Sequence, residues 1–511
     1  MTGYFIYFLL LVVAALSLPA YYFDPAATQF VLALGVIAIW RYGWAITHFT
    51  RALIFRKIVF PKWRRQTIEL GAAADPSHVF FLLTTFRIGT DVTTQVYREA
   101  FKEAIRCNLP VTIVVSIVEM SEEKIIKTIF HAHEPPARVK LKIVRISGTG
   151  KRDALAAGFR AIASTPVDKS TAVASVIDGD SILAPGSTLA CARLFALNPK
   201  LGALTTDEVC NLIGDDFITG IYRRWYSMRF AQRHVYMSSM GLSRRVLTLT
   251  GRMSMFRASL ISDADFISGV QHDHINHWRL GRFRFLTGDD KSSWYHLLKN
   301  GWEMWYVPDV QVITIEEPPH PNFFIGANTL MRRWFGNMLR TNSRALKVPR
   351  KTMGTFVWWN LLDQRISMWT SLFGLCAAII GASKFGITLL LMYAWWIAFT
   401  RYSQALMLLS SRKKISITWP FLIYFNQIYG SLVKIYVLSH LSKQKWTRQK
   451  TTLAQGGNKF DRWYQQSSSN VSVVAYLILF VTGVTFVTGV FSISDIYQYL
   501  LAVGDQLDGS I

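Results

Sequence analysis

Acidic residues are scarce in this chain, and three groups of them fall in the polar part of the sequence. The chain has 511 residues, with 56 Lys and Arg against 32 Asp and Glu. The groups are Asp178-Gly179-Asp180, Asp207-Glu208 and Asp289-Asp290. Carboxylates grouped at predicted strand ends are suited to hold a divalent cation with a phosphorylated substrate, or to act as a base. We therefore expect the chemistry of this protein to lie among these clusters.

The cluster Asp178-Gly179-Asp180 directly follows Thr171–Ile177, an apolar segment that predicts a buried strand. Two carboxylates two residues apart can turn toward one site. Mg²⁺ or Mn²⁺ is commonly bound by one or two carboxylates together with substrate phosphates. Asp-Gly is also a common turn sequence. The preceding strand and the acidic pair downstream favour a metal site, with Asp178 and Asp180 as its ligands.

Asp289 and Asp290 follow Thr287-Gly288 and precede a predicted helix that begins near Ser292. Adjacent carboxylates raise one another's pKa, which suits one of them to accept a proton as a general base. Acidic residues are also favoured at a helix start. The two roles are compatible, because a helix start would fix the base in place.

Apolar runs alternate with helical segments through the polar region. The predicted strands are His78–Thr85, Val111–Val118, Val139–Ile146, Thr171–Ile177 and Leu201–Thr206, and the predicted helices are Thr93–Ile105, one from Ser121, and Gly148–Ala163. This alternation predicts an α/β fold with an open, doubly wound sheet that binds ligands at the carboxyl ends of its strands. Thr84, Glu119 and Asp178 fall at such ends. No GxGxxG or Walker A sequence is present, which disfavours a dinucleotide oxidoreductase or a P-loop ATPase.

Strongly apolar segments flank this region. Hydrophobic residues make up 51% of the chain and charged residues 17%, which counts against a purely soluble protein. The predicted spans are Tyr4–Leu18, Phe30–Ile46, Ser367–Gly381, Ile387–Leu409 and Val471–Phe491. Basic residues follow the second span, whereas Pro19–Gln29 has no Lys or Arg. The positive-inside rule therefore places the polar region in the cytoplasm.

The apolar segment Trp419–Leu441 contains Asn426, Gln427 and Lys434, and a basic stretch follows it. If it crossed the membrane, that basic stretch would lie outside, so we predict an interfacial or re-entrant helix pair. This gives five spans, with six as the alternative. The predicted domains are an N-terminal transmembrane hairpin (1–50), a cytosolic domain (60–348), and interfacial helices with a C-terminal transmembrane region (350–511).

The net charge of +24 is compatible with nucleic acid, anionic lipid, or anionic substrates and products as partners. The apolar spans, and the lack of helix-turn-helix, zinc-finger and RNP patterns, weigh against nucleic acid. Four cysteines are spread without CxxC spacing, which predicts reduced thiols rather than a disulfide framework.

An ordered set of motifs resembles the processive family 2 glycosyltransferases, which include cellulose, chitin and hyaluronan synthases. The motifs are Lys151-Arg152-Asp153-Ala154-Leu155, Asp178-Gly179-Asp180, Leu280-Gly281, Gly288-Asp289-Asp290-Lys291 and Arg333-Trp334. The run from His277 to Ser292 is most similar to the catalytic subunits of bacterial alginate synthases. The resemblance extends from Val79 to Trp334. It implies a GT-A-like cytosolic domain inserted between N- and C-terminal transmembrane helices.

The resemblance also implies roles for individual residues. On the donor side, Thr84 and Glu119 would lie near the nucleotide base and ribose, and Lys151 would lie near the phosphates. Asp178 would contact the nucleotide, and Asp180 together with Asp178 would bind Mg²⁺ or Mn²⁺. On the acceptor side, Asp290, next to Asp289, would be the general base that deprotonates the acceptor hydroxyl, and Asp207 would help to frame the acceptor. The family usually has Asp where this chain has Glu119.

Arg333-Trp334 matches the end of the family's Gln-x-x-Arg-Trp motif, with Leu330 at the Gln position. The resemblance implies that Arg333 holds the diphosphate and that Trp334 stacks on the acceptor sugar. Interfacial anchoring is the alternative for both. The contact normally made by Gln would come from a nearby side chain, for which Arg332, Asn337 and Arg340 are candidates.

The segment Lys445-Trp446-Thr447-Arg448 resembles a basic segment of chitin and hyaluronan synthases that closes over the nucleotide diphosphate. This implies a contact between Arg448 and the nucleotide sugar. A basic segment beside a membrane is also a common lipid anchor.

The nearest resemblance implies a processive, inverting transferase that polymerises mannuronate from GDP-mannuronate into β-1,4-polymannuronate and passes it across a bacterial inner membrane. It further implies a lipid bilayer, a growing polysaccharide, a separate cyclic-di-GMP-binding co-polymerase and periplasmic export or scaffold proteins as partners. Three alternatives stay open: a hyaluronan-, chitin- or cellulose-type synthase using a UDP-sugar, a polyprenyl-phosphate glycosyltransferase, and a channel or transporter with a regulatory nucleotide-binding domain.

Overall fold

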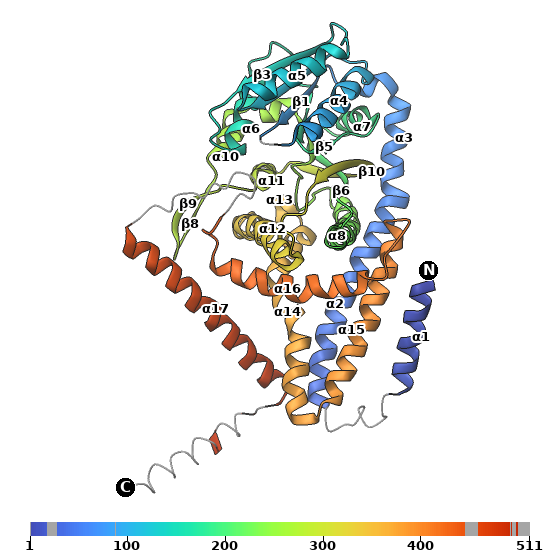
Figure 1. Cartoon of the computed structure of the whole chain (residues 1–511), viewed down its shortest axis with the longest axis vertical. Helices are drawn as coiled ribbons and strands as arrows, with labels where there is room; N and C mark the ends of the chain where they lie inside the picture. The colour runs from blue at the N-terminus through green and yellow to red at the C-terminus, as the bar shows by residue number, and fades with distance from the viewer. Residues whose placement is uncertain are drawn as a thin grey trace. The chain divides into compact units, whose positions relative to one another are not determined.

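Figure 1 shows a computed structural model of the protein, which describes residues 2–17, 28–86, 88–444, 458–490, 492 and 497–498. The chain divides into two units. The first comprises Met1–Thr47, Gln364–Ser439 and Lys459–Ile511, and its described elements are helices. The second comprises His48–Asp363 and His440–Asn458 and holds the sheets.

The second unit is built on an eight-stranded mixed sheet in the order β3-β2-β1-β4-β7-β6-β10-β5. Its strands are β1 (Val79–Thr84), β2 (Val111–Ile117), β3 (Val139–Arg145), β4 (Val173–Asp178), β5 (Ser181–Ile182), β6 (Leu201–Leu212), β7 (Met253–Arg257) and β10 (Glu303–Glu316). A separate hairpin pairs β8 (His274–His277) with β9 (Gly281–Arg284). The first four predicted strands are confirmed to within two residues at each end. Strands β1, β2 and β4 are almost fully buried, as expected for parallel strands covered by helices, whereas β3 lies at the sheet edge with Val139 as its buried residue.

The parallel part of the sheet is doubly wound, as predicted. Strand β1 pairs with β2 on one side and with β4 on the other, and β2 pairs with β3. The chain therefore moves outward through α4 (Thr90–Arg106) and α5 (Met120–Ala132), and returns to β4 through α6 (Lys151–Ala163). Right-handed crossovers then place α4 and α5 on one face and α6 on the other. The carboxyl ends of these four strands share one edge.

The sheet becomes mixed beyond β4, where β7 runs antiparallel to both β4 and β6, and β6 pairs in parallel with β10. Strand β6 is 12 residues long, so the predicted strand Leu201–Thr206 is too short. Asp207 and Glu208 lie inside β6, where both are buried, and not after it. The strand accommodates them because each has a partner: Nδ1 of His234 lies 3.2 Å from Asp207, and Nη1 of Arg252 lies 3.0 Å from Glu208.

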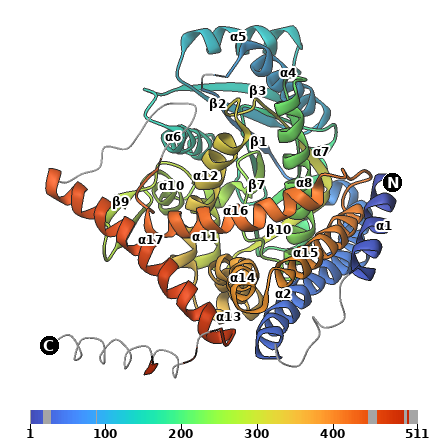
Figure 2. The same ribbon diagram turned by 60° about the horizontal axis from the view of Figure 1, so that its bottom comes forward.

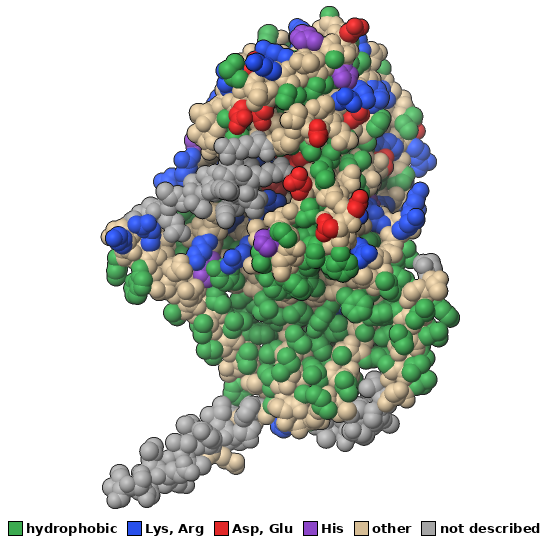
Figure 3. Space-filling view, viewed as in Figure 1, with side chains coloured by type: hydrophobic (Ala, Val, Ile, Leu, Met, Phe, Trp, Pro, Cys, Tyr) green, Lys and Arg blue, Asp and Glu red, His purple; other side chains and the backbone are tan. Residues whose placement is uncertain are grey.

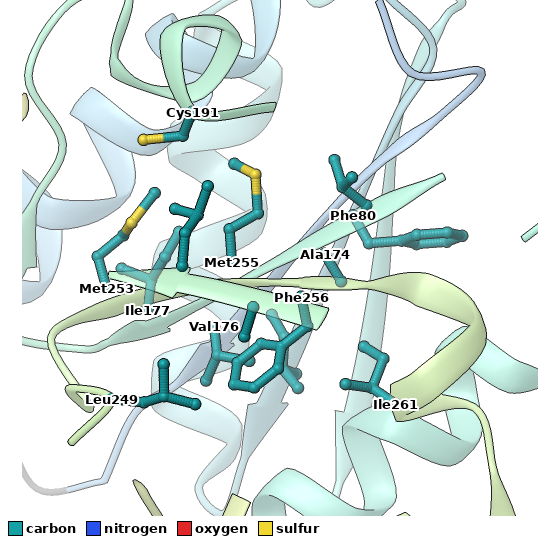
Figure 4. Packing of buried hydrophobic residues seen from close by; sticks show 14 of the residues in the cluster. Phe80, Ala174, Val176, Ile177, Cys191, Leu249, Met253, Met255, Phe256 and Ile261 are labelled. Carbon is teal, nitrogen blue, oxygen red and sulfur yellow. The ribbon is translucent and has the colours of Figure 1, made fainter. Parts of the chain in front are cut away.

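Both faces of the sheet are apolar. Figure 4 shows this where β4 meets β7: Met255 and Phe256 are neighbours on β7 and project from opposite sides of the ribbon. This alternation is the normal geometry of a strand. Most positions of such a strand are apolar, with small buried polar residues such as Ser175 and Ser254 among them. Full burial of one large apolar side chain contributes about 1.5–3 kcal/mol. The site residues are carried at the ends of this rigid core.

The remaining helices of this unit surround the sheet. They are α3 (Phe60–Leu70), α7 (Ser187–Ala192), α8 (Phe217–Gly241), α9 (Ala258–Ile261), α10 (Ala264–Gln271), α11 (Asp289–Lys299), α12 (Phe323–Ala345) and α13 (Arg350–Met353). Helix α12 begins at the cap residue Asn322, whose side chain accepts hydrogen bonds from the backbone N–H groups of Phe324 and Ile325. Helices α11 and α12 are in contact and carry the residues predicted for the acceptor side.

The first unit contains α1 (Thr2–Leu16), most of α2 (Thr28–Ile54), most of α14 (Thr355–Phe385), α15 (Thr388–Met407), α16 (Trp419–Ser439) and α17 (Lys459–Val487). Each predicted span is α-helical over most of its described residues and departs from the α-helix only at its ends. Hydrophobic side chains cover most of the visible surface of these helices, whereas charged side chains lie over the sheet-bearing unit (Figure 3). Among the described residues, three helices are long and apolar enough to cross a membrane: α14, α16 and α17.

Helix α16 differs from its prediction, since Trp419–Ser439 is one continuous helix rather than a pair. Its polar residues do not break the helix. The side-chain amide of Gln427, for example, donates a hydrogen bond to the backbone oxygen of Ser371. Figures 1 and 2 show α16 running crosswise to α14 and α15 within this unit. A bilayer crossed by α14 and α15 would therefore hold α16 along its surface. Since α16 is also long and apolar enough to cross a membrane, its interfacial position stays a prediction.

Candidate active site

A cleft of about 550 Å³ opens at the carboxyl ends of the parallel strands. Four groups of residues line it: the strand ends and loop beyond β1 (Thr84, Thr85, Phe86), the start of α6 (Gly150, Lys151), the acidic segment after β4 (Asp178, Gly179, Asp180), and the segment 286–290 with one face of α12 (Leu330, Arg333, Trp334, Asn337). Four of the predicted acidic positions, Asp178, Asp180, Asp289 and Asp290, thus share one cleft.

The segment Asp178-Gly179-Asp180 lies directly against the end of β1. Thr84 and Asp178 are register partners in neighbouring parallel strands. A Cβ atom at Gly179 would lie 2.7 Å from the backbone oxygen of Thr84, so a side chain at this position would force the strand ends apart. The glycine between the two acidic residues is therefore required by packing, which the turn interpretation alone did not predict.

Lys151 connects the carboxylates predicted for the donor side and for the acceptor side. It is the first residue of α6, and its Nζ lies 2.5 Å from Oδ1 of Asp178 and 3.3 Å from Oδ2 of Asp289. Gly251 makes room for this ion pair, since a Cβ there would lie 2.8 Å from Asp178 and 3.0 Å from the Lys151 amine. One half-buried ammonium group thus links two acidic clusters that lie more than a hundred residues apart in the sequence.

The pKa values of this group reflect burial and mutual repulsion. Burial raises the pKa of Asp178 to about 6; Lys151 opposes the shift, and Asp180 and Asp289 add to it. Burial alone would lower the pKa of Lys151, but the Asp178 and Asp289 carboxylates outweigh it and the pKa is raised. Lys151 therefore stays charged, while Asp178 is a carboxylate that a second cation would stabilise.

Asp289 and Asp290 are the first two residues of α11, which starts earlier than the predicted Ser292. They differ in charge environment. Burial acts to raise the pKa of Asp289, but Lys151 and Arg152 outweigh it, so that pKa is lowered. Burial and the neighbouring Asp289 raise the pKa of Asp290. Asp290 is therefore the better proton acceptor of the two, and the predicted base lies within the first turn of α11.

Arg152 holds the loop before these residues. Its side chain is buried, and it donates hydrogen bonds to the backbone oxygens of Thr287 (2.9 Å) and Val270 (2.6 Å). It also donates to Oγ of Ser292 at 3.0 Å. The start of α6 thus fixes both sides of the cleft: Lys151 reaches the carboxylates, and Arg152 reaches the backbone that carries them.

One face of α12 closes the cleft. Leu330, Arg333, Trp334 and Asn337 recur at helical spacing, and all four line it. Oδ1 of Asn337 accepts a hydrogen bond of 2.7 Å from Oγ1 of Thr287. Of the three side chains proposed to replace the family's Gln, Asn337 is therefore the one that both lines the cleft and contacts the acceptor-side loop.

Trp334 lies on an aromatic surface provided by α8. Its ring centroid is 5.7 Å from that of Trp225 and 6.1 Å from that of Tyr226, and the guanidinium of Arg229 lies 4.2 Å from its ring. This packing fixes the ring and leaves Trp334 partly exposed to the cleft. The geometry fits a stacking surface for a sugar ring.

An ion-pair network on the far wall of the cleft was not predicted. Arg252 contacts Glu316 at 2.7 Å and Glu208 at 3.0 Å, and the Tyr226 hydroxyl donates to Glu316 at 2.9 Å. Burial acts to raise the pKa of Glu316, but Arg252 outweighs it and the pKa is lowered. Arg252 and Glu316 lie at the ends of strands far apart in sequence, and no motif spacing signals their pairing.

Three predicted site residues are not placed in the cleft. Glu119 is exposed and forms a capping box with Glu122 at the start of α5. Asp207 is buried within β6, where the Tyr306 hydroxyl and the Gln311 amide donate to it at 3.3 and 3.1 Å. Arg448 lies outside the described residues.

The carboxylate oxygens of Asp178 and Asp180 fit a metal ion that is also bound by a substrate. Among the described residues, no group of three or more His, Cys, Asp or Glu side chains is arranged to hold a metal ion. Asp178 and Asp180 supply two carboxylates that line the cleft. Two carboxylates suffice for Mg²⁺ or Mn²⁺ when phosphate oxygens and water complete the coordination. The residues therefore fit an ion that arrives with a phosphorylated ligand, rather than a closed protein site.

The chain is similar to several known proteins. A sequence-family model described as "Glycosyltransferase like family 2" matches residues 76–337. The protein "Glycosyltransferase alg8" of Pseudomonas syringae pv. tomato is 47% identical over 479 residues, which is 94% of this chain and 96% of the relative. The protein of the same name from Azotobacter vinelandii is 45% identical over 480 residues, with the same coverage.

Among solved structures, the mannosyltransferase PcManGT from Pyrobaculum calidifontis, in complex with GDP-Man and Mn²⁺, aligns with a TM-score of 0.46 at 15% identity. The alignment covers 78% of this chain and 98% of that one. The sequence relatives, by contrast, match the helical segments at both ends as well as the sheet-bearing unit.

Proposed function

The chain belongs to the family 2 glycosyltransferases, and from this premise we propose that it polymerises mannuronate from GDP-mannuronate into β-1,4-linked polymannuronate, the precursor of alginate. The observation that carries the proposal is the contact of Lys151 with Asp178 and Asp289 in one cleft. It brings donor-side carboxylates within reach of the candidate base Asp290. The identity of 45–47% to the alg8 glycosyltransferases supports the choice of donor.

We propose that transfer occurs in one step with inversion. The oxygen of the acceptor hydroxyl forms a bond to the anomeric carbon of the donor sugar while the bond from that carbon to the diphosphate breaks. Asp290 accepts the proton that the hydroxyl loses. A raised pKa suits Asp290 to this role. Lys151 and Arg333 line the cleft and would neutralise the charge on the departing diphosphate. Trp334, held by Trp225 and Arg229, would stack on the acceptor sugar.

Asp178 and Asp180 would hold Mg²⁺ or Mn²⁺ together with the diphosphate. When bound, the ion would supply positive charge to the leaving group. Thr84 lines the same part of the cleft and would contact the nucleotide. Three further assignments have less support: Glu119 caps a helix, Asp207 is enclosed in β6, and Arg448 rests on its motif alone.

We further propose an inner-membrane protein with its sheet-bearing unit in the cytoplasm, which passes the polymer through its own helices. The three apolar helices α14, α16 and α17, each long enough to span a bilayer, support a membrane location. The inner membrane, the orientation, a cyclic-di-GMP-binding co-polymerase and periplasmic export proteins come from the family resemblance.

Labelled donors test the proposal directly. Membranes containing this chain, supplied with the co-polymerase and cyclic di-GMP, are incubated separately with GDP-mannuronate, UDP-glucose and UDP-N-acetylglucosamine. We expect polymer from GDP-mannuronate only, sensitive to a β-1,4-mannuronate lyase and lost on chelation of divalent cations. Polymer from a UDP-sugar alone would replace the proposal with the β-glycan synthase alternative. Transport retained in Asp290→Asn membranes would favour a channel or transporter.

A further inference from the structure

The loop 285–288, which precedes Asp289 and Asp290, receives a contact from a distant part of the chain. Residues His440–Gln444 follow α16 in sequence and belong to the sheet-bearing unit. The backbone N–H of Leu286 donates to Oε1 of Gln444 at 2.9 Å, and Nε2 of Gln444 donates to the backbone oxygen of Arg284 at 2.8 Å. One carboxamide thus satisfies a donor and an acceptor two residues apart, as a neighbouring strand would.

A second contact links the same segment to the loop. The backbone oxygen of Leu441 accepts a hydrogen bond of 3.1 Å from the buried Arg340. Arg340 in turn donates to Oδ1 of Asn337 at 2.6 Å, and Asn337 also accepts from Thr287. The segment therefore holds the loop at Leu286 directly and at Thr287 through two side chains of α12.

The loop has little freedom on its other side. The backbone N–H of Phe285 donates to the oxygen of Asp273 at 2.9 Å. Gly288 adopts a positive φ of 83°, and a Cβ there would lie 2.9 Å from the side chain of Asn337. The contacts of Gln444 hold the backbone at Arg284 and Leu286, on either side of the Phe285–Asp273 hydrogen bond.

We propose that Gln444 is a positioning residue for the catalytic base: by pairing with the backbone of Arg284 and Leu286, it sets the position of the loop from which Asp290 projects. The proposal rests on the proposed function of Asp290. A base must lie within hydrogen-bond distance of the proton it accepts, and a misplacement of about 1 Å is able to reduce the rate about 100-fold. Gln444 touches neither the donor nor the base.

The test uses the full chain in membranes with two variants. Gln444→Met removes both hydrogen bonds at nearly constant shape, and Gln444→Glu keeps the acceptor while losing the donor. Lys443→Met is the matched control, because Lys443 is the exposed neighbour of Gln444. We measure kcat and KM for GDP-mannuronate, and separately the Kd for GDP on purified protein.

We expect Gln444→Met to lower kcat about 10- to 100-fold, and Gln444→Glu to lower it less, with KM and the GDP Kd unchanged within about twofold. Lys443→Met should match the unchanged chain. Unchanged kcat in both Gln444 variants would overturn the proposal. So would a parallel loss of kcat and GDP affinity in both variants, since that indicates a general structural role. Lack of polymer from the unchanged chain would instead contradict the proposed function itself.

Discussion

The two sides of the cleft are held in different ways. On the donor side, Thr84 and Asp178 are register partners in adjacent parallel strands, so backbone hydrogen bonds fix them. On the acceptor side, Asp289 and Asp290 begin a helix after a loop held by side chains, of which Arg152 comes from α6 and Asn337 from α12. Backbone hydrogen bonds between strands tolerate many side-chain changes. A loop held by side chains depends on each of the side chains that hold it.

Lys151 is the point where the two sides meet. It contacts Asp178 on one side and Asp289 on the other, and it lies at the start of a helix packed on the sheet. We infer that the sheet transmits its rigidity to the acceptor-side loop through α6. The following predictions separate the two sides, from the largest expected effect to the smallest.

Replacing the base should affect the acceptor side alone. We expect Asp290→Asn to lower polymer formation about 1,000-fold, because general-base catalysis contributes about 100- to 10,000-fold. Binding of GDP should stay within a few-fold, since the ion pairs of Lys151 with Asp178 and Asp289 stay intact in this variant. Rate and GDP affinity are measured together. Asp215→Asn, at a side chain that is 98% exposed, serves as the control.

Replacing Lys151 should affect both sides at once. In Lys151→Met the carboxylates of Asp178 and Asp289 lose their shared cation, and truncating one partner of a buried charge pair costs about 2–5 kcal/mol. We expect GDP affinity to fall about 100-fold and kcat to fall as well. The control is Lys124→Met on the exposed side of α5. A defect confined to either binding or rate would show that the two sides are independent.

Adding one methyl group should separate the strand ends. We expect Gly179→Ala to lower activity about 10- to 30-fold, because its Cβ would lie 2.7 Å from the Thr84 oxygen and would displace Asp178 and Asp180. The concentration of Mn²⁺ needed for half-maximal activity should rise. Gly220→Ala in α8, where nothing lies within 4 Å, should leave both quantities unchanged. If the Mn²⁺ concentration needed for half-maximal activity does not change, the assignment of Asp178 and Asp180 as metal ligands is wrong.

The two sides should also differ in pH dependence. Each carboxylate must be ionised to act, and a raised pKa moves the loss of the charged form to higher pH. Asp178, with a pKa of about 6, should lose metal and donor affinity as the pH falls from 7 to 5. The raised pKa of Asp290 should lower kcat over the acid range. Asp178→Asn should abolish the acid dependence of KM but keep that of kcat, which steady-state profiles can measure.

The smallest effect is expected at Glu119. Because this residue caps α5 and is exposed, Glu119→Ala should leave polymer formation within about twofold and lower stability by about 0.5–2 kcal/mol. Thermal unfolding and the initial rate measure the two effects. A large loss of activity at unchanged stability would restore the nucleotide contact implied by the family resemblance.

The donor side was largely predictable from the sequence. Apolar runs of seven or eight residues placed four strands to within two residues at each end, and Asp178 followed from the end of the fourth. Strand β6 was predicted too short, because acidic residues ordinarily mark a strand end. Here Arg252 and His234 neutralise Glu208 and Asp207 inside the sheet, and neither partner is near them in sequence.

The sequence by itself determined the strand and helix alternation, the apolar flanking helices and the candidate chemistry of Asp178, Asp180 and Asp290, because periodicity and motif spacing are local properties. Only the tertiary structure decided that Lys151 joins the two acidic clusters and that Glu119 and Asp207 lie away from the cleft. It also placed Gln444 against the loop before the base. These contacts join residues dozens to more than a hundred positions apart, and packing of the whole fold sets such distances.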